Sequence, residues 1–246
     1  MFTFIGILLL GWVSGGIINY LSDVLPYKRR LSQPICTACG ATQSPITLIL
    51  PYRCASCGKP KSLRWWLVNA ITVLVCAILY LIPTQPLGFW LGFLLYCYFA
   101  IVMVIDIEHR LILFPVSIAG MVLGAALGIV LHGILATIIG GLAGFAIMYF
   151  LYYMGALFAK WMAKRRGQTI DEPALGFGDV MLSGVIGFVL GWPGIAAGLI
   201  LGILFGGAFS LVVIVSHLVK KTYSPFMAIP YGPFLILGTM VLLYRF

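Results

Sequence analysis

Charged residues, and acidic residues above all, are scarce in this chain. Six of its 246 residues are Asp or Glu, and all charged residues together make up 9% of the sequence, against roughly 25% in soluble domains. Hydrophobic residues account for 62%. Because so little charge cannot cover a water-facing surface, the composition excludes a soluble globular protein and indicates a polytopic membrane protein.

Several familiar site patterns are also missing. The three histidines, His109, His132 and His217, occur without the HExxH spacing of a zinc hydrolase, and the chain has neither a phosphate-binding glycine loop nor a serine–histidine arrangement. The formal net charge of +9 would suggest nucleic acid as a partner of a soluble protein. In this chain the basic residues lie between apolar runs, so we expect membrane lipids as neighbours and no nucleic-acid partner.

Eight apolar runs predict eight transmembrane helices, although some are shorter than the usual spanning length of about 18 residues. They cover residues 1–21, 67–82, 87–105, 116–131, 134–159, 176–190, 195–215 and 229–243. The first run has no basic start and no clear small-residue cleavage site, so we expect a retained helix and not a signal peptide. The sequence thus predicts an all-α polytopic membrane protein with about eight transmembrane helices. Residues 1–22 would form the first helix, 23–66 a small polar insert and 67–246 the main membrane domain.

The distribution of Lys and Arg predicts the orientation of these helices. Seven of the fifteen lie in the 23–66 insert, and the loops after the third, fifth and seventh helices hold one, four and two. The loops after the even-numbered helices hold none, and only Arg245 lies on that side. Because loops rich in Lys and Arg stay in the cytoplasm, we expect both termini outside and the insert in the cytoplasm.

Two aspartates, Asp106 and Asp179, stand at the ends of apolar runs, where a carboxylate is costly and a functional role is the default hypothesis. Asp106 ends the third predicted helix as it reaches the cytoplasmic side, and Asp179 begins the sixth as it leaves that side. The predicted topology therefore brings both to the same depth, although 73 residues separate them. Two carboxyls that share a site cannot both ionise easily, and such a pair can activate water as in an aspartyl protease.

A structural role for each aspartate is the alternative. Asp179, near a helix N-terminus, would be favoured by the helix dipole and could cap the helix. The dipole disfavours Asp106 at a C-terminus, although Arg110, four residues on, could pair with it. Gly176 and Gly178 precede Asp179, and we interpret them as support for a locally unwound catalytic loop, with ordinary helix packing as the alternative.

Four of the six cysteines form two CxxC pairs, Cys36 with Cys39 and Cys54 with Cys57, separated by fourteen residues. Four thiolates at such spacing can form a closed tetrahedral zinc site. Disulfides are the less favoured alternative in a cytoplasmic loop. A closed site of four cysteines is structural, so we expect Zn²⁺ to order the insert and not to catalyse.

Taken together, these motifs resemble the type IV prepilin leader peptidases, a family of GxGD-type membrane aspartyl proteases. The two CxxC pairs match its cytoplasmic zinc insert. Ile105-Asp106 matches the segment that bears its first catalytic aspartate, and Gly176-Phe-Gly-Asp179 matches the GxGD motif that bears the second. Two further segments resemble its opening and closing helices: Gly15-Gly-Ile-Ile-Asn19 with Leu25-Pro26, and Ile229-Pro-Tyr-Gly-Pro-Phe234.

The resemblance implies an intramembrane endopeptidase with Asp106 and Asp179 as catalytic residues. Such enzymes cleave the basic leader, usually after a glycine, from prepilin-like precursors at the cytoplasmic face of the bacterial inner membrane. Many members also N-methylate the new N-terminus with S-adenosyl-L-methionine, and the zinc insert suggests this bifunctional form. The processed subunits serve type IV pili, type II secretion or DNA uptake. Neither the methyl-donor site nor an oligomeric state follows from the sequence.

Two positions depart from the family pattern. The family often has a lysine two residues after the second aspartate, where this chain has Met181. It often has Pro-Asp in the segment after the first aspartate, where this chain has Phe114-Pro115-Val116. Both departures leave the two carboxyls in place and put substrate positioning in doubt.

Two other functions would use the same residues. A proton- or cation-coupled transporter could use the two aspartates as a relay, although the two halves of the chain show no convincing similarity of the inverted-repeat kind. A structural assembly protein could recruit partners through the zinc insert, and its aspartates would then be dispensable.

Overall fold

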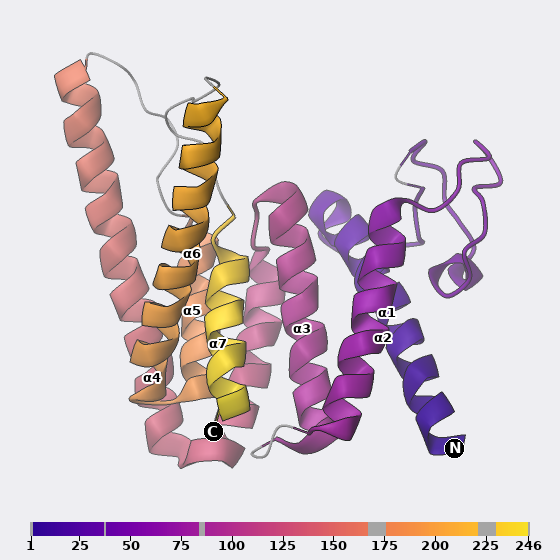
Figure 1. Ribbon diagram of the computed structural model, residues 1–246, viewed down its shortest axis with the longest axis horizontal. Helices are drawn as coiled ribbons and strands as arrows, with labels where there is room; N and C mark the ends of the chain where they lie inside the picture. Colours follow the sequence, from indigo (N-terminus) through magenta and orange to yellow (C-terminus); the bar gives the residue numbers. More distant parts are fainter. Residues whose placement is uncertain (1, 37, 84–86, 167–175, 221–229, 246) are drawn as a thin grey trace. The chain divides into compact units, whose positions relative to one another are not determined.

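The computed structural model describes residues 2–36, 38–83, 87–166, 176–220 and 230–245. The helices (Figure 1) are α1 (Phe2–Lys28), α2 (Leu63–Leu81), α3 (Gly88–His109), α4 (Phe114–Arg166), α5 (Phe177–Leu190), α6 (Gly194–Val219) and α7 (Gly232–Arg245), with one short 3-10 helix, η1 (Pro45–Leu48). Within the described residues the β pairing is limited to an isolated bridge between Ile35 and Thr42. The predicted all-α class is confirmed.

The long helix α4 is two helices joined at a kink. Gly133 has φ 78° and ψ 170°, which interrupts the helix in a backbone conformation that glycine adopts far more readily than other residues. The predicted break at His132-Gly133, between the apolar runs 116–131 and 134–159, is therefore confirmed. With α4 counted as two helices, the described residues form eight α-helical segments. In that part of the chain five helices are long and apolar enough to cross a membrane, and α5 and α7 are shorter apolar helices. These helices support the predicted multi-pass membrane architecture.

Helix α1 continues beyond the predicted run of residues 1–21 and ends at Lys28. The reason lies in its packing, because Ser22 and Val24 are fully buried and extend the packed face of the helix by another turn. The next residue after the helix, Arg29, has a positive φ of 50°. The polar residues at the start of the predicted insert are therefore helical.

The chain divides into two compact units, Met1–Ile105 and Asp106–Phe246. In the first unit α1 packs closely on α2, since a Cβ at Gly11 would lie 2.9 Å from the Cα of Val73. The segment between α1 and α2 also touches α1. The Trp12 Nε1–H donates to the carbonyl of Ile49 (2.8 Å), and this contact holds the end of η1 against α1.

The second unit is held by glycine contacts between helices. A Cβ at Gly140 of α4 would lie 2.4 Å from the carbonyl oxygen of Gly187 in α5, and one at Gly144 would lie 2.3 Å from that of Ser183. A Cβ at Gly202 of α6 would lie 2.9 Å from Leu235 in α7. Small residues that let membrane helices touch are the usual packing device, and these glycines allow the same close contact between helices.

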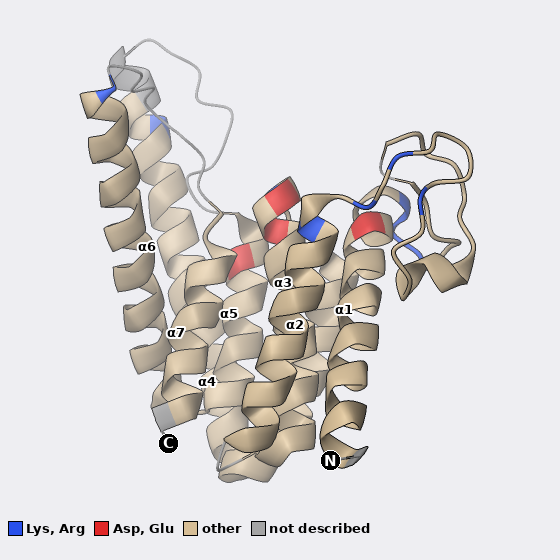
Figure 2. Cartoon of the chain, turned by 45° about the vertical axis from the view of Figure 1, so that its right-hand side comes forward, with Lys and Arg blue, Asp and Glu red and all other residues tan. Residues whose placement is uncertain are grey.

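Charged residues occupy helix ends and the insert. In the part of the chain that Figure 2 describes, Lys, Arg, Asp and Glu lie near the ends of the helices or in the polar segment that follows α1, and the helix bodies carry none. A charge is most easily solvated outside the hydrocarbon core. The placement is that of a protein whose helices cross a bilayer.

Candidate active site

Asp106 lies in the last turn of α3 and is buried, with 4% of its surface exposed. Its Oδ2 accepts a hydrogen bond from the backbone N–H of Gly232, the first residue of α7, at 3.1 Å. Arg110, which could have paired with this carboxylate, contacts Asp106 through a backbone hydrogen bond instead. Its N–H donates to the Asp106 carbonyl (2.8 Å), and its φ of 51° marks the end of the helix. The carboxylate is thus held by the start of another helix.

Asp179 lies in the first turn of α5 and is also buried, with 8% of its surface exposed. Its Oδ2 accepts from the Gly176 N–H at 3.2 Å, and its own N–H donates to the Gly176 carbonyl at 3.1 Å. This reciprocal pair has the pattern of a capping box. Asp179 is thus the third residue of α5 and not its N-cap, which is Gly176, and the hydrogen bond back to Gly176 fixes the direction in which the carboxylate points.

The two glycines of the GxGD motif serve different purposes. Gly176 is the N-cap of α5 and is extended, with φ −78° and ψ 145°. Gly178 lies inside the helix rather than in an unwound segment, so its absent side chain matters through packing. A Cβ there would lie 2.7 Å from the Cβ of Ile112. The segment that follows α3 therefore presses directly on the first turn of α5.

The two carboxyl groups come together around Ile112. This residue packs on Gly178, and its Cδ1 lies 3.5 Å from where a Cβ at Gly232 would stand. Gly178 directly precedes Asp179, and the Gly232 N–H donates to Asp106, so Ile112 contacts the surroundings of both carboxyl groups. The second unit therefore brings the two predicted site residues to one place, from α3 and α5.

Tyr231 and Gly232 belong to the site and were not assigned to it from the sequence. The ring of Tyr231 packs against α6, where a Cβ at Gly206 would lie 2.9 Å from its Cε2. Tyr231 directly precedes Gly232, whose backbone N–H donates to Asp106. Gly232 is 126 residues from Asp106, and the only sequence signal was the Pro-Tyr-Gly-Pro run, interpreted merely as a closing helix.

Such an arrangement suits acid–base chemistry. Two neighbouring buried carboxyls share one proton near neutral pH, because ionising both in one apolar site is unfavourable. One group is then a base and the other a hydrogen-bond donor. Met181, which stands where the resembled family often has lysine, is buried in α5, so a thioether occupies a position where an ammonium group is common.

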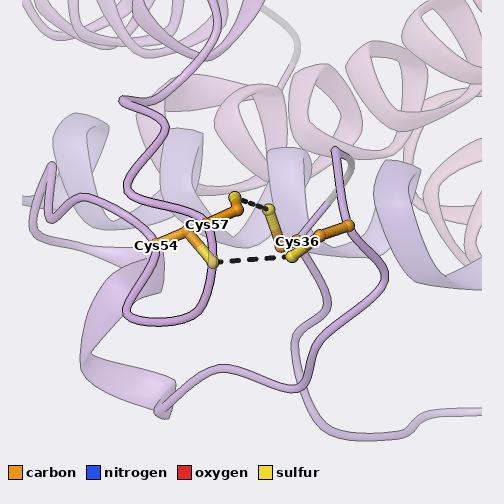
Figure 3. Close-up of side chains that lie close together, drawn as sticks. Cys36, Cys54 and Cys57 are labelled. Atoms are coloured by element: carbon orange, nitrogen blue, oxygen red, sulfur yellow. Dashed lines mark hydrogen bonds between the residues drawn. The ribbon is translucent and has the colours of Figure 1, made fainter.

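The four predicted metal ligands form one cluster in the first unit. The sulfur atoms of Cys36, Cys39, Cys54 and Cys57 all lie within 4.8 Å of one another. The Sγ atoms of Cys36 and Cys57 are 3.8 Å apart, and those of Cys39 and Cys54 are 3.7 Å apart (Figure 3). A tetrahedron with Zn–S bonds of about 2.3 Å has edges of about 3.8 Å. All six cysteines are free in this structure, and the four clustered sulfur atoms could hold a metal ion such as Zn²⁺.

Two tight turns build the cluster. The Gly40 N–H donates to the carbonyl of Cys36 and the Gly58 N–H to that of Cys54, both at 2.8 Å. Both glycines have positive φ, 74° and 69°, which glycine adopts without strain. Backbone hydrogen bonds from Cys57 and Ser56 lower the pKa of Cys54 to about 6. In the same cluster the pKa of Cys39 is raised to about 12, because lost solvation and hydrogen bonds with the other cysteines outweigh a backbone hydrogen bond from Ala41, so a metal ion would have to displace the proton of Cys39.

Comparison with known proteins agrees with this geometry. Residues 93–211, a range that includes both aspartates, match the type IV leader peptidase family. The prepilin leader peptidase/N-methyltransferase of Aeromonas hydrophila is 26% identical over 239 residues, which are 90% of this chain and 75% of that protein.

A protein of the same name from Aeromonas salmonicida is 26% identical over 202 residues, 80% of this chain and 64% of that relative, so the match spans less than two thirds of the relative's length. No solved structure is significantly similar. Residues 93–211 therefore match a type IV leader peptidase domain, and the family resemblance that the motifs predicted is confirmed.

Proposed function

We propose that this protein is an intramembrane aspartyl endopeptidase that removes the basic leader from type IV prepilin-like precursors. The observation that carries the proposal is the buried pair Asp106 and Asp179, brought from two helices to one place inside the matched family domain. Capping accounts for Asp179 alone. It gives no reason for a second buried acid beside it, and intramembrane acids are rare unless they serve a function.

In the proposed reaction, the ionised carboxyl takes a proton from a water molecule held between the two aspartates. The water oxygen attacks the carbonyl carbon of the scissile peptide bond while the protonated carboxyl donates a hydrogen bond to the carbonyl oxygen. The C–N bond then breaks, and the leaving nitrogen takes a proton. Hydrogen bonds from the N–H groups of Gly176 and Gly232 fix the orientation of the two carboxyl groups. The carboxyl groups therefore need little reorganisation before the reaction.

The proposed orientation places this site at the cytoplasmic face of the bacterial inner membrane. Fourteen of the fifteen Lys and Arg residues fall in the 23–66 insert or in the loops after the third, fifth and seventh predicted helices. Such loops stay in the cytoplasm. Prepilin-like precursors, with their basic leaders on that side, would meet the aspartates there.

The second activity that we propose is N-methylation of the newly exposed N-terminus. Relatives from both Aeromonas species carry this activity in their names. S-adenosyl-L-methionine would supply the methyl group. The neutral amine of the cleaved subunit forms the new N–C bond with its lone pair as the C–S bond breaks, the sulfur keeps that electron pair, and the nitrogen releases one proton. Zn²⁺ on the four cysteines would order the insert, since four thiolates leave no open position.

The test is mass spectrometry of a pilin-like precursor after incubation with purified protein. Wild type should release the leader and, with S-adenosyl-L-methionine present, add the mass of one methyl group to the mature subunit. Asp106→Asn and Asp179→Asn should leave the precursor intact. Cleavage by both variants at the wild-type rate would rule out the mechanism and would favour the transporter or assembly alternative.

A further inference from the structure

Four aromatic rings beside Asp179 take no part in the proposed chemistry. They belong to Phe145, Tyr149 and Tyr152 of α4 and to Phe177 of α5. We propose that this aromatic cluster binds the apolar, membrane-embedded segment that follows the scissile bond of the precursor. The inference rests on the proposed peptidase function, and it assigns the residues that recognise this part of the substrate.

The rings of the cluster contact one another across the two helices. The ring centre of Phe145 lies 6.1 Å from that of Tyr149 and 6.4 Å from that of Phe177. The ring centre of Tyr152 lies 6.3 Å from that of Tyr149 and 6.1 Å from that of Phe177. Separations of about 4.5–7 Å are those of interacting aromatic pairs. Each ring is therefore held in place by two others.

Two rings of the cluster are half exposed, although the helix beside them is buried. Tyr149 is 48% exposed and Phe177 is 47% exposed. In α5 every residue from Asp179 to Leu190 except Phe188 is buried. Because the exposed rings are already held by their neighbours, a partner that contacts them has little side-chain freedom to restrict. The cluster therefore offers a preorganised apolar surface.

The first turn of α5 joins the aromatic cluster to the carboxyl pair. Phe177 directly follows Gly176, whose N–H donates to the Asp179 Oδ2 at 3.2 Å. The hydrogen bond that orients the carboxylate thus also fixes the backbone that carries the Phe177 ring. A peptide bond held at Asp179 would have its neighbouring residues beside the cluster.

Helix lengths indicate which part of a precursor can reach these rings. Helix α5 has 14 residues, which span about 21 Å of a hydrocarbon core roughly 30 Å thick. In the proposed orientation its first residue, Phe177, therefore lies below the cytoplasmic boundary of the core. Helix α4 continues well beyond the start of α5 (Figure 1), and its first basic residue after Tyr149 is Lys160, about 16 Å further along the helix. Because a cation is costly at the depth of the rings, they suit the apolar segment and not the basic leader.

An aromatic belt that contacts lipid is the alternative explanation of such rings. A belt does not require rings that connect two helices, or a place beside a buried carboxyl group. Phe158, further along α4, has the features of a belt residue, since it is 59% exposed and its ring contacts Trp161 of the same helix. Phe158 is therefore the matched control.

The experiment measures the affinity of the full-length protein in lipid nanodiscs for two fluorescent probes. One is a mature pilin-like subunit, which has the apolar segment without the leader, and the other is a basic leader peptide alone. Tyr149→Ala and Phe177→Ala should each weaken subunit binding by about tenfold, and Phe177→Leu should recover part of the loss because it restores apolar contact. Leader binding in these variants, and subunit binding by Phe158→Ala, should stay within about twofold of wild type.

Cleavage of the intact precursor separates substrate binding from chemistry. Tyr149 lies outside the first turn of α5, so Tyr149→Ala should raise KM by about tenfold while kcat changes by less than about threefold. This KM also decides the question if the mature subunit binds wild type too weakly to measure. Wild-type affinity and KM in both ring variants would overturn the inference, as would an equal loss in Phe158→Ala.

Two further outcomes distinguish the cluster from its alternatives. Loss of leader binding instead of subunit binding would assign the rings to the cations of the leader and would overturn the inference. A wild type that binds the subunit through these rings but does not cleave the precursor would refute the peptidase and leave the role of the cluster standing.

Discussion

The four-cysteine cluster and the aspartate pair differ in how far along the chain their residues are drawn from. Cys36 and Cys57 are 21 residues apart, and two tight turns with glycines at positive φ shape the cluster. Asp106 and Gly232 are 126 residues apart, and helix packing throughout the second unit brings them together. The first site therefore depends on its own turns and on the metal ion that we propose for it, and the second depends on the positions of whole helices. Substitutions and zinc removal should therefore affect one of the two sites more than the other.

Removal of either carboxyl that we propose to be catalytic should have the largest effect on leader cleavage. We expect Asp106→Asn and Asp179→Asn each to lower the cleavage rate by about 10³-fold or more, because each removes one half of the acid–base pair. The measurement is the single-turnover rate on a pilin-like precursor. Glu108→Gln is the control, since it removes an exposed carboxylate two residues from Asp106 on the same helix. A comparable loss in the control would mean that general charge, and not the pair, matters.

A smaller loss is expected when the support of Asp106 is disturbed. In Gly232→Ala the new Cβ would stand 2.8 Å from the Asp106 Oδ2, so the carboxylate must move. A displacement of this size should lower kcat by about 10- to 100-fold, measured by steady-state cleavage. Gly207→Ala in α6, with open space around the new methyl group, should cleave normally. Full activity in Gly232→Ala would show that the bond from Gly232 is not needed.

Packing between α4 and α5 should matter less for cleavage and more for stability. In Gly187→Ala the added Cβ would lie 2.2 Å from the carbonyl oxygen of Gly140, which forces α5 away from α4. Overpacking of this kind costs about 1–3 kcal/mol, and we expect a loss of a few-fold in cleavage. Unfolding in a denaturing detergent measures the stability. Gly6→Ala, where nothing lies within 4 Å, should be neutral, and equal stability of the two variants would contradict the close contact.

Zinc removal should have the smallest effect on cleavage. The cysteines belong to the first unit and the aspartates to the second, so chelation should unfold the insert and abolish methylation while the cleavage rate changes by less than about threefold. Structural zinc sites contribute on the order of 10 kcal/mol to folding, so the insert should become sensitive to protease. Zinc added back should restore methylation and the protease resistance of the insert. A loss of cleavage as large as that of Asp106→Asn would show that the two regions are not separable.

The sequence was most informative where a site or element is local. The clustering of the four cysteines and the break at His132-Gly133 depend on residues that are close in sequence, and both were predicted correctly. The end of α1 was placed too early, because the polar residues Ser22 and Asp23 follow the apolar run, and the burial of Ser22 depends on what packs against it.

Long-range contacts could not be predicted from the sequence. It indicated that Asp106 and Asp179 would lie at one depth, but the amide of Gly232 and the side chain of Ile112 reach the site only through the packing of other helices. No period or motif records which residue of a distant helix will face a carboxylate.

The most direct test of the account is the cleavage rate of the double variant Asp106→Asn/Asp179→Asn beside both single variants. Residues that act as one unit give strongly non-additive losses. We predict that the double variant is no slower than the slower single variant, because either substitution alone already disables the pair. Losses that multiply in the double variant would show that the two carboxyls act independently, and this would contradict a shared site for water activation.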